Sequence, residues 1–400
     1  FVPHCNFGTE YEVCRLAKKL NVPVLLWGPR DECPDENGMR LRDSQCGLFA
    51  TGKVLRRFGI PFTYLKNCNL EDECFAEGID RFLRVCNVVK AFRNTRVLQI
   101  STRPFDFWST MCNEGELLEK FGIQLSPIPM PELTQAMKDV KENSPEEIKE
   151  VTDYCREKMC IKVTPEQLDN VAALKIAMTR LGKKYGCNCG AIQCWNALQD
   201  EIGIMPCAAN ALCNDEGFPI ACETDIHGTI TSVLVEAAAM GETRSFFADW
   251  TVRHPYNDNA ELLQHCGPWP ISIAKEKPTI DTPVAFDCSG SLMAQAKDGE
   301  HISLVRFDGD NGEYSLLLGN AKTVDGPYTK GTYMWVEVEN LDRLEDKLVQ
   351  GPYIHHCVGV HQDVVPVLYE ACKYIGVTPD LYDPIEEKVK AIIRGEKVEK

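Results

Sequence analysis

The sequence lacks any long run of apolar residues. Within its 400 residues, no stretch approaches the roughly 18 to 20 apolar side chains in succession that a membrane-spanning helix needs. The first residues also lack the charged start and apolar middle of a secretory signal peptide. We therefore expect a soluble protein with a cytoplasmic location and no membrane partner.

Positive charge is scarce. Lys and Arg number 43 against 59 Asp and Glu, so the formal net charge is -16. Surfaces that bind nucleic acid need clustered Lys and Arg to neutralise phosphates. This balance argues against a nucleic-acid partner. Hydrophobic residues make up 44% and charged residues 26%, which is typical of a globular enzyme.

The 20 cysteines do not follow a metal-binding spacing. Zinc and iron-sulfur sites favour repeated Cys-x-x-Cys, and the dense group Cys187, Cys189 and Cys194 lacks that pattern. A disulfide framework is typical of short secreted chains. The sequence therefore favours free thiols in a reducing compartment.

The first part of the chain alternates between two patterns. Helical spacing at 10–20 and 48–58 is interleaved with strand-like segments at 23–27 and 61–65, and a further strand-like segment follows at 95–100. This alternation predicts parallel strands joined by helices. We expect a first α/β domain over 1–92 and a second over 93–240. Because the chain opens with Phe1 in a strand-like segment, the first domain is expected to be truncated.

Two helices of the second domain have sequence signals at their starts. Ser144 and Thr164 each precede a proline, and each is followed three residues later by an acid or an amide. This arrangement predicts a hydroxyl cap and a proline in the first turn. The second helix is expected to end at Gly186.

The pattern changes from residue 270 onward. Short alternating segments at 283–287, 301–307, 314–318 and 333–338 are separated by turns. They predict an antiparallel sheet or small barrel. The predicted fold class is thus α/β, with parallel-sheet domains followed by a β-rich, barrel-like C-terminal domain over 241–400. Terminal helices are expected at 364–375 and 385–393.

Two acids and a histidine pair are candidate metal ligands. Glu223 ends an apolar run, where α/β sheets usually present ligands, and Asp249 follows the apolar Phe246-Phe247-Ala248. A buried acid without a partner is costly, and a cation is one way to satisfy it. Glu223 could instead be an ordinary acid at a strand end, and Asp225 is either an alternative carboxylate or only a helix cap. Together with His355-His356, the two acids suffice to hold a divalent ion.

These segments resemble the metal-binding segments of the L-fucose isomerase and L-arabinose isomerase superfamily. The resemblance rests on Ile220–Gly228, Phe246–Thr251 and Ile354–Val358, in the same order and at similar spacing. It implies Rossmann-like domains, the first truncated, before the β-rich domain. It also implies a metal-dependent intramolecular oxidoreductase that interconverts an aldose and a ketose through a metal-stabilised enediolate.

The resemblance further implies a role for each candidate residue. Glu223 and Asp249 become metal ligands that also act as catalytic carboxylates, and His356 completes the ligand set. His355, His265 and Gln193 become substrate-binding residues, with His265 alternatively a further ligand. Oxygen-rich ligand sets of this kind favour Mn²⁺ or a similar ion.

The expected partners are a small-molecule sugar and further copies of the chain in a homo-oligomer. The sequence outside the metal segments matches neither branch of the superfamily closely, so the sugar stays open. The alternative function is a non-catalytic sugar-binding or regulatory paralogue on the same scaffold.

Overall fold

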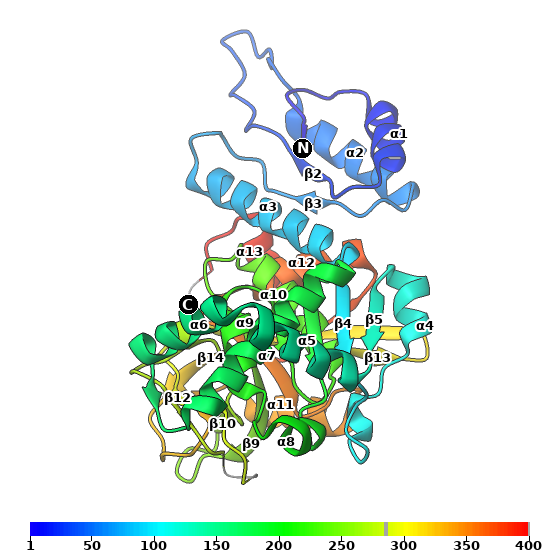
Figure 1. The fold of residues 1–400 in the computed structure, drawn as a ribbon. Coiled ribbons are helices and arrows are strands. Elements are labelled where there is room, and N and C mark those ends of the chain that lie inside the picture. Colours follow the sequence, from blue (N-terminus) through cyan, green and yellow to red (C-terminus); the bar gives the residue numbers. More distant parts are fainter. Residues whose placement is uncertain (284–286, 399–400) are drawn as a thin grey trace. The chain divides into compact units, whose positions relative to one another are not determined.

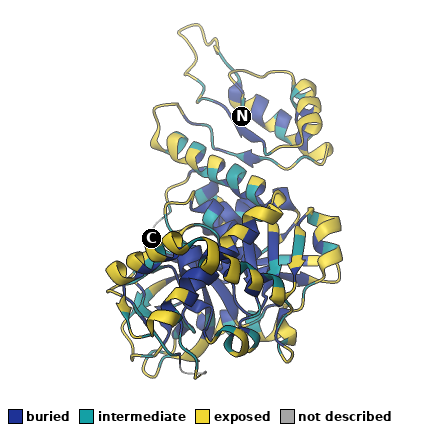
Figure 2. Ribbon diagram, in the orientation of Figure 1, coloured by how far each residue is buried: buried dark blue, intermediate teal, exposed yellow. Residues whose placement is uncertain are grey.

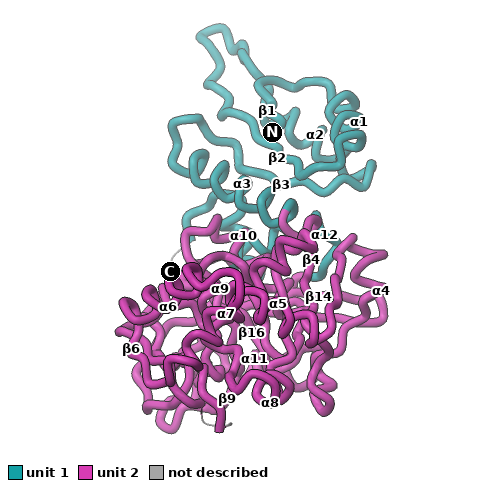
Figure 3. Tube along the Cα trace, in the orientation of Figure 1, with its two compact units in different colours: residues 1–90, 365–378, 384–400 teal, residues 91–364, 379–383 magenta. Residues whose placement is uncertain are grey.

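The protein divides into two compact units. The computed structural model describes residues 1–283 and 287–398. Unit 1 comprises residues 1–90, 365–378 and 384–400, and unit 2 comprises residues 91–364 and 379–383 (Figure 3). Among the described residues, no helix is long and apolar enough to cross a membrane.

Unit 1 is built on a small parallel sheet. Its strands β1 (Val2–Pro3), β2 (Leu25–Trp27) and β3 (Thr63–Tyr64) lie in the order β1-β2-β3. They alternate with helices α1 (Glu10–Leu20), α2 (Ser44–Arg57) and α3 (Glu73–Arg93), which confirms the predicted alternation. Strand β2 is buried on both faces, because Leu26 packs with the α1 and α2 side chains while Leu25 and Trp27 pack with Phe82 of α3.

The two predicted terminal helices are also confirmed. They are α12 (Val365–Ile375) and α13 (Glu386–Arg394), and both belong to unit 1. Within this unit the buried Thr63 hydroxyl donates a 2.6 Å hydrogen bond to Glu370 of α12. The unit is therefore assembled from segments at both ends of the chain.

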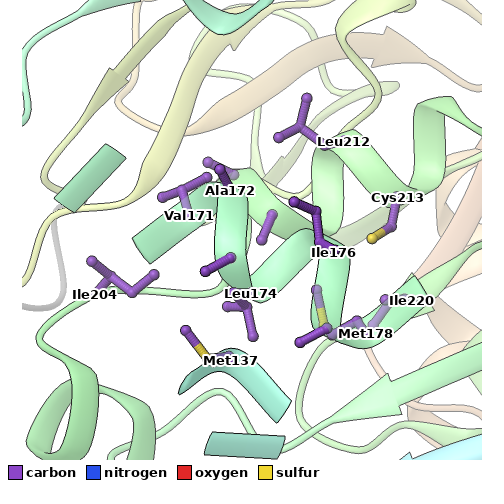
Figure 4. Packing of buried hydrophobic residues seen from close by; sticks show 14 of the residues in the cluster. Met137, Val171, Ala172, Leu174, Ile176, Met178, Ile204, Leu212, Cys213 and Ile220 are labelled. Atoms are coloured by element: carbon purple, nitrogen blue, oxygen red, sulfur yellow. The ribbon is translucent and has the colours of Figure 1, made fainter. Parts of the chain in front are cut away.

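Unit 2 begins with a second parallel sheet. Strands β4 (Arg96–Ile100), β5 (Gln124–Ile128), β7 (Cys189–Ile192) and β8 (Ile220–Ala221) lie in the order β5-β4-β7-β8. The helices of this part are η1 (Trp108–Thr110), α4 (Glu114–Glu116), η2 (Leu117–Phe121), α5 (Met130–Asn143), α6 (Pro145–Lys158), α7 (Pro165–Tyr185), α8 (Ala197–Ile202), α9 (Cys207–Asp215) and α10 (Ile226–Ala238). Figure 4 shows the buried side of α7, where Leu174 and Met178 pack among residues of the neighbouring elements.

The start of α7 follows its sequence signal. The Thr164 side chain accepts a hydrogen bond from the backbone of Gln167, whose own side chain bonds back to Thr164, and Gly186 ends the helix at a φ of 66°. The hydroxyl cap predicted for α6 is wrong. Ser144 does stand before Pro145, but its hydroxyl makes no cap bond and accepts from Arg180 instead.

The β-rich part of unit 2 closes into an antiparallel ring. Its strands are β9 (Phe246–Arg253), β10 (Ala260–His265), β13 (Ile302–Asp310), β14 (Glu313–Val324), β15 (Thr332–Glu337) and β16 (His356–Val360). They pair in the order β14-β13-β16-β9-β10-β15, and β15 pairs again with β14. The barrel prediction is confirmed, and most residues of these strands are buried (Figure 2).

Shorter strands extend the sheet, β17 beside β14 and β12, β11 and β6 in that order beyond β15, and β12 is labelled in Figure 1. They are β6 (Cys160–Ile161), β11 (Thr279–Asp281), β12 (Ser291–Gln295) and β17 (Thr378–Leu381). The strand expected at 283–287 includes residues 284–286, which lie outside the described residues. Helix α11 (Leu341–Gln350) was not predicted, because its buried side is narrow and consists chiefly of Leu341 and Leu344.

Close packing inside the barrel generates a first prediction. Gly359 of β16 lies opposite Phe246 of β9, and a Cβ at this position would stand 2.1 Å from the Phe246 ring. We expect Gly359→Ala to lower the free energy of unfolding by about 1 to 3 kcal/mol, because overpacking forces neighbours to shift. Chemical denaturation measures this loss. Gly115→Ala is the control, since its Cβ would meet only Asn113 at 3.5 Å, and an equal loss there would contradict the packing argument.

A half-buried acid of the barrel generates a second prediction. Burial, with a contribution from Glu345, raises the pKa of Glu261 in β10 to about 7. An acid whose pKa is raised on folding holds more protons in the native state, so stability falls as the pH rises from about 4.5 to about 7. We expect Glu261→Gln to remove part of this fall in denaturation curves across that range. The exposed Glu300→Gln should keep the wild-type slope, and an identical slope in Glu261→Gln would contradict the assignment.

Candidate active site

A strained turn presents Glu223. The turn follows β8, and Glu223 and Thr224 adopt φ values of 51° and 52°, in the left-handed region that side chains disfavour. Backbone hydrogen bonds hold it, from Thr224 to Ile192 O at 3.0 Å and from Asp225 to Cys222 O at 2.9 Å. Strain of this kind persists where the surroundings over-determine the backbone, and it is concentrated at functional sites.

Three neighbouring barrel strands present the other candidate ligands. Asp249 of β9 lies directly opposite His356 of β16 and, on its other side, opposite Gln264 of β10. His265 is the next residue of β10. Hydrogen-bonded register therefore brings together residues that are far apart in the sequence.

Four side-chain atoms of these residues converge. His265 Nε2 lies 3.5 Å from Glu223 Oε2 and 3.9 Å from Asp249 Oδ1. His356 Nε2 lies 4.0 Å from the same Glu223 oxygen and 3.5 Å from the same Asp249 oxygen. Two ligands on one ion with bonds of about 2 Å can be at most about 4 Å apart. Each of these pairs has a separation that two ligands of one cation can have, and two trios, Glu223 with His265 and His356 and Asp249 with His355 and His356, are each grouped within 4.8 Å.

The electrostatics of the group also favour a cation. Within the described residues, Glu223 Oε2 and Asp249 Oδ1 are buried oxygens with no hydrogen-bond partner. Burial opposes the charge on Glu223, yet His265 and His356 outweigh it and hold the pKa of Glu223 at about 2. Burial likewise opposes a charge on His265, but Asp249 and Glu223 raise the pKa of its imidazole to about 9. The carboxylates thus attract positive charge to this point, and the donor set fits a divalent ion.

The second oxygen of Glu223 is occupied by other partners. Its Oε1 accepts hydrogen bonds of 3.2 Å from the Cys194 thiol and from the Trp195 indole. Both donors come from the segment after β7. They fix the rotation of the carboxylate, so that Oε2 is the oxygen turned toward the imidazoles.

Asp225 orients His356. Its carboxylate caps α10 by accepting from the Gly228 backbone at 2.9 Å, and it faces His356 Nδ1 at 2.7 Å. An imidazole that donates its Nδ1 proton to a carboxylate keeps Nε2 free to bind a metal. Of the roles weighed for Asp225, the structure shows the cap and adds this contact with His356.

A buried arginine completes the Asp225 environment. Arg306 of β13 donates to both Asp225 oxygens and, through Nε, to Asp308 at 2.9 Å. Arg306 and Asp225 side chains are each only 1% exposed. Arg306 and the Arg306–Asp308 pair were missed in the sequence, although opposite charges two residues apart in the otherwise uncharged segment 302–308 were a usable signal.

His355 and Gln193 are the two candidate residues that do not belong to the converging group. His355 is exposed, and its side chain can be grouped with Asp249 and His356 within 4.8 Å. Its ring meets Phe107 edge-on, and Phe107 also contacts Trp195. The Gln193 amide oxygen accepts a 2.7 Å hydrogen bond from Ser101, which holds Gln193 at the ends of β4 and β7. The roles of both residues in binding substrate stay predictions.

Comparison with known proteins identifies relatives of this chain. The family described as "Fucose/sulfoquinovose isomerase, N-terminal domain" matches residues 1–93. A sulfoquinovose isomerase of Priestia aryabhattai is 25% identical over 384 residues, which cover 94% of this chain and 84% of the relative. A sulfoquinovose isomerase of Alkalicoccus urumqiensis is 24% identical over 357 residues, which cover 88% and 79%.

The resemblance to the fucose isomerase-like superfamily is confirmed. The predicted enzyme class, an aldose–ketose isomerase, is confirmed by the same relatives.

The contact between Asp225 and His356 generates a third prediction. Asp225→Asn should lower the affinity for Mn²⁺ by about 10- to 100-fold, because an amide no longer enforces the His356 tautomer with Nε2 free. Calorimetric titration of the purified protein with Mn²⁺ measures this change.

Asp308→Asn is the matched control. Like Asp225→Asn, this substitution removes a carboxylate that pairs with Arg306. In the wild-type protein, however, Asp308 bonds to His227 rather than to His356. We expect it to lower thermal stability while leaving Mn²⁺ affinity near the wild-type value. An equal loss of affinity in both variants would instead assign the effect to Arg306 and general packing.

Proposed function

We propose that the protein is a divalent-metal-dependent isomerase that converts sulfoquinovose, or a closely related aldose, to the corresponding ketose. The observation that carries the metal dependence is the convergence of Glu223 Oε2, Asp249 Oδ1, His265 Nε2 and His356 Nε2. The names of the relatives supply the sugar.

The ligands on this proposal are Glu223, Asp249 and His356, with His265 as a fourth. The short distances from His265 Nε2 to both carboxylates support that fourth position. Two carboxylates and two imidazoles suit Mn²⁺ or a similar ion. When bound, such an ion polarises the sugar carbonyl and offsets the negative charge that develops as a proton leaves the adjacent carbon.

The two carboxylates differ in how they could move that proton. Glu223 is 5% exposed, and its Oε1 is held by Cys194 and Trp195. The Asp249 side chain is 23% exposed. Asp249 is therefore better placed to take a proton from one sugar carbon and return it to the next, while Glu223 serves chiefly as a ligand. A positioned general base typically contributes about 10² to 10⁴-fold in rate.

Aromatic rings and His355 can contact the sugar. Phe107 and Trp195 lie with their ring centres 5.4 Å apart, and such faces stack on the apolar face of a sugar ring. Although the residue is exposed as a whole, desolvation of its imidazole and the neighbouring His356 lower the pKa of His355. A neutral imidazole can both donate to and accept from a sugar hydroxyl.

A sugar panel tests the proposal and is our fourth prediction. We expect the purified protein with Mn²⁺ to form ketose from sulfoquinovose faster than from glucose, L-fucose or L-arabinose, and to lose the activity with a chelator. In deuterated water the product should carry solvent deuterium, because a carboxylate exchanges the transferred proton. Glu223→Gln and Asp249→Asn should each lower the rate by at least about 10²-fold.

The controls separate chemistry from folding. Glu313→Gln makes the same change as Glu223→Gln at an exposed acid of β14 and should keep wild-type activity. Far-ultraviolet circular dichroism and thermal midpoints check that each variant is folded. Undiminished turnover with the chelator, or in Glu223→Gln, would contradict the metal site. Metal binding without ketose from any sugar would favour the non-catalytic alternative.

A further inference from the structure

A separate group of potential metal ligands lies in unit 1. Cys68 Sγ, a carboxylate oxygen of Asp72 and Cys74 Sγ all lie within 4.8 Å of one another. The segment carries no Cys-x-x-Cys spacing, since the two cysteines are separated by five residues. We propose that these three side chains form a binding site for a thiophilic divalent cation of the Zn²⁺ class.

The donor set and its dimensions suit such an ion. Zinc binds thiolate at about 2.3 Å and carboxylate at about 2.1 Å, so neighbouring ligand atoms in a tetrahedral site are about 3.5 to 4 Å apart. The three atoms are already grouped within 4.8 Å, and closing on an ion needs only small side-chain rotations. A water molecule would complete the tetrahedron. Sulfur donors make this group softer than the carboxylate and imidazole group of the candidate active site.

Local backbone structure places the three ligands in advance. Cys68 lies in the loop after β3, and Asp72 and Cys74 flank the first residue of α3. Asp72 Oδ2 accepts a 2.8 Å hydrogen bond from the Asn69 backbone, and Asp72 O accepts one of 2.9 Å from Phe75. These bonds fold the loop back on the helix start. The ligands therefore come together without rearrangement of the chain.

Cys68 also has the surroundings of a metal-bound sulfur. It is 3% exposed, and the Trp27 indole donates a 3.3 Å hydrogen bond to its Sγ. Hydrogen bonds and apolar walls around ligand atoms are usual outside metal sites and tune them.

The site lies where distant parts of unit 1 meet. A Cβ at Gly395 would stand 3.3 Å from the Cys74 Cβ, so the segment after α13 packs against this ligand. The backbone of Lys66 donates to Arg394 O at 3.1 Å, and Lys397 pairs with Glu73 at 3.1 Å. A cation bound here stabilises the loop on which the C-terminal segment rests, since a ligand that binds only the folded state favours folding.

Metal binding by the full chain tests the inference and is our fifth prediction. The reduced protein is equilibrated with Zn²⁺, dialysed and analysed for bound zinc, and Cd²⁺ titration follows thiolate charge-transfer absorption. Relative to wild type, Cys74→Ser should lose one molar equivalent of zinc and the matching part of the cadmium signal. The zinc-induced rise in thermal midpoint should shrink in the same variant, and Asp72→Asn should weaken binding without abolishing it.

Cys86→Ser is the matched control. Cys86 is also half-buried and packs on the same apolar cluster, but it lies outside the ligand group. It should keep the wild-type stoichiometry, and the comparison cancels zinc taken up at Cys194, Cys222 and Glu223, which form another potential group. Equal zinc content in Cys74→Ser and wild type would overturn the proposal. So would mass spectrometry showing Cys68 and Cys74 joined as a disulfide in the freshly purified protein. Isomerase activity is measured separately, so its loss or absence leaves this test unaffected.

Discussion

The buried carboxylate of Asp225 is the interaction on which the candidate active site depends. It caps α10, forms an ion pair with Arg306 and bonds to His356. Burying an ion pair stabilises a protein little by itself, but leaving one partner alone is strongly destabilising. A helix of the parallel-sheet layer and two barrel strands must therefore keep one relative position. Burial opposes the Asp225 charge, yet Arg306 and His356 hold its pKa far below the ordinary value.

The pairing register of the barrel strands brings the candidate ligands close together. His356 lies opposite Asp249, and Asp249 lies opposite Gln264, the residue before His265. Side chains alternate between the two faces of a strand, so a shift of one residue between β9 and β16 would turn Asp249 and His356 away from one another. The tight contact between Gly359 and Phe246 in the same strand pair opposes such a shift. Strands β9 and β16 therefore carry both the tight contact between Gly359 and Phe246 and two of the candidate ligands, Asp249 and His356.

Local signals in the sequence predicted the parts of the fold that local physics controls. The capping box at Thr164, the stop at Gly186 and the alternating strands of the barrel all correspond to observed elements. Helix α11 was missed because few of its side chains are buried, and the Ser144 cap was wrong because Arg180, which is distant in sequence, takes the hydroxyl. Arg306 was missed for a related reason. Its partner Asp225 lies 81 residues away, and only the folded chain brings the two together, although Asp308, two residues along the same strand, was a local signal.

The choice between the paired histidines shows the same limit. Spacing alone left His355 and His356 equivalent, and only resemblance to a family favoured His356. The structure distinguishes them physically, since His356 is buried with both ring nitrogens facing acidic groups, whereas His355 is exposed. The two neighbouring histidines therefore differ in burial and in the acidic groups that their ring nitrogens face. The two site carboxylates differ in the same manner, because Glu223 is enclosed by Cys194 and Trp195 while Asp249 stays partly open. Environment can separate the roles of groups with similar intrinsic chemistry, as we propose for Glu223 as a ligand and Asp249 as a proton carrier.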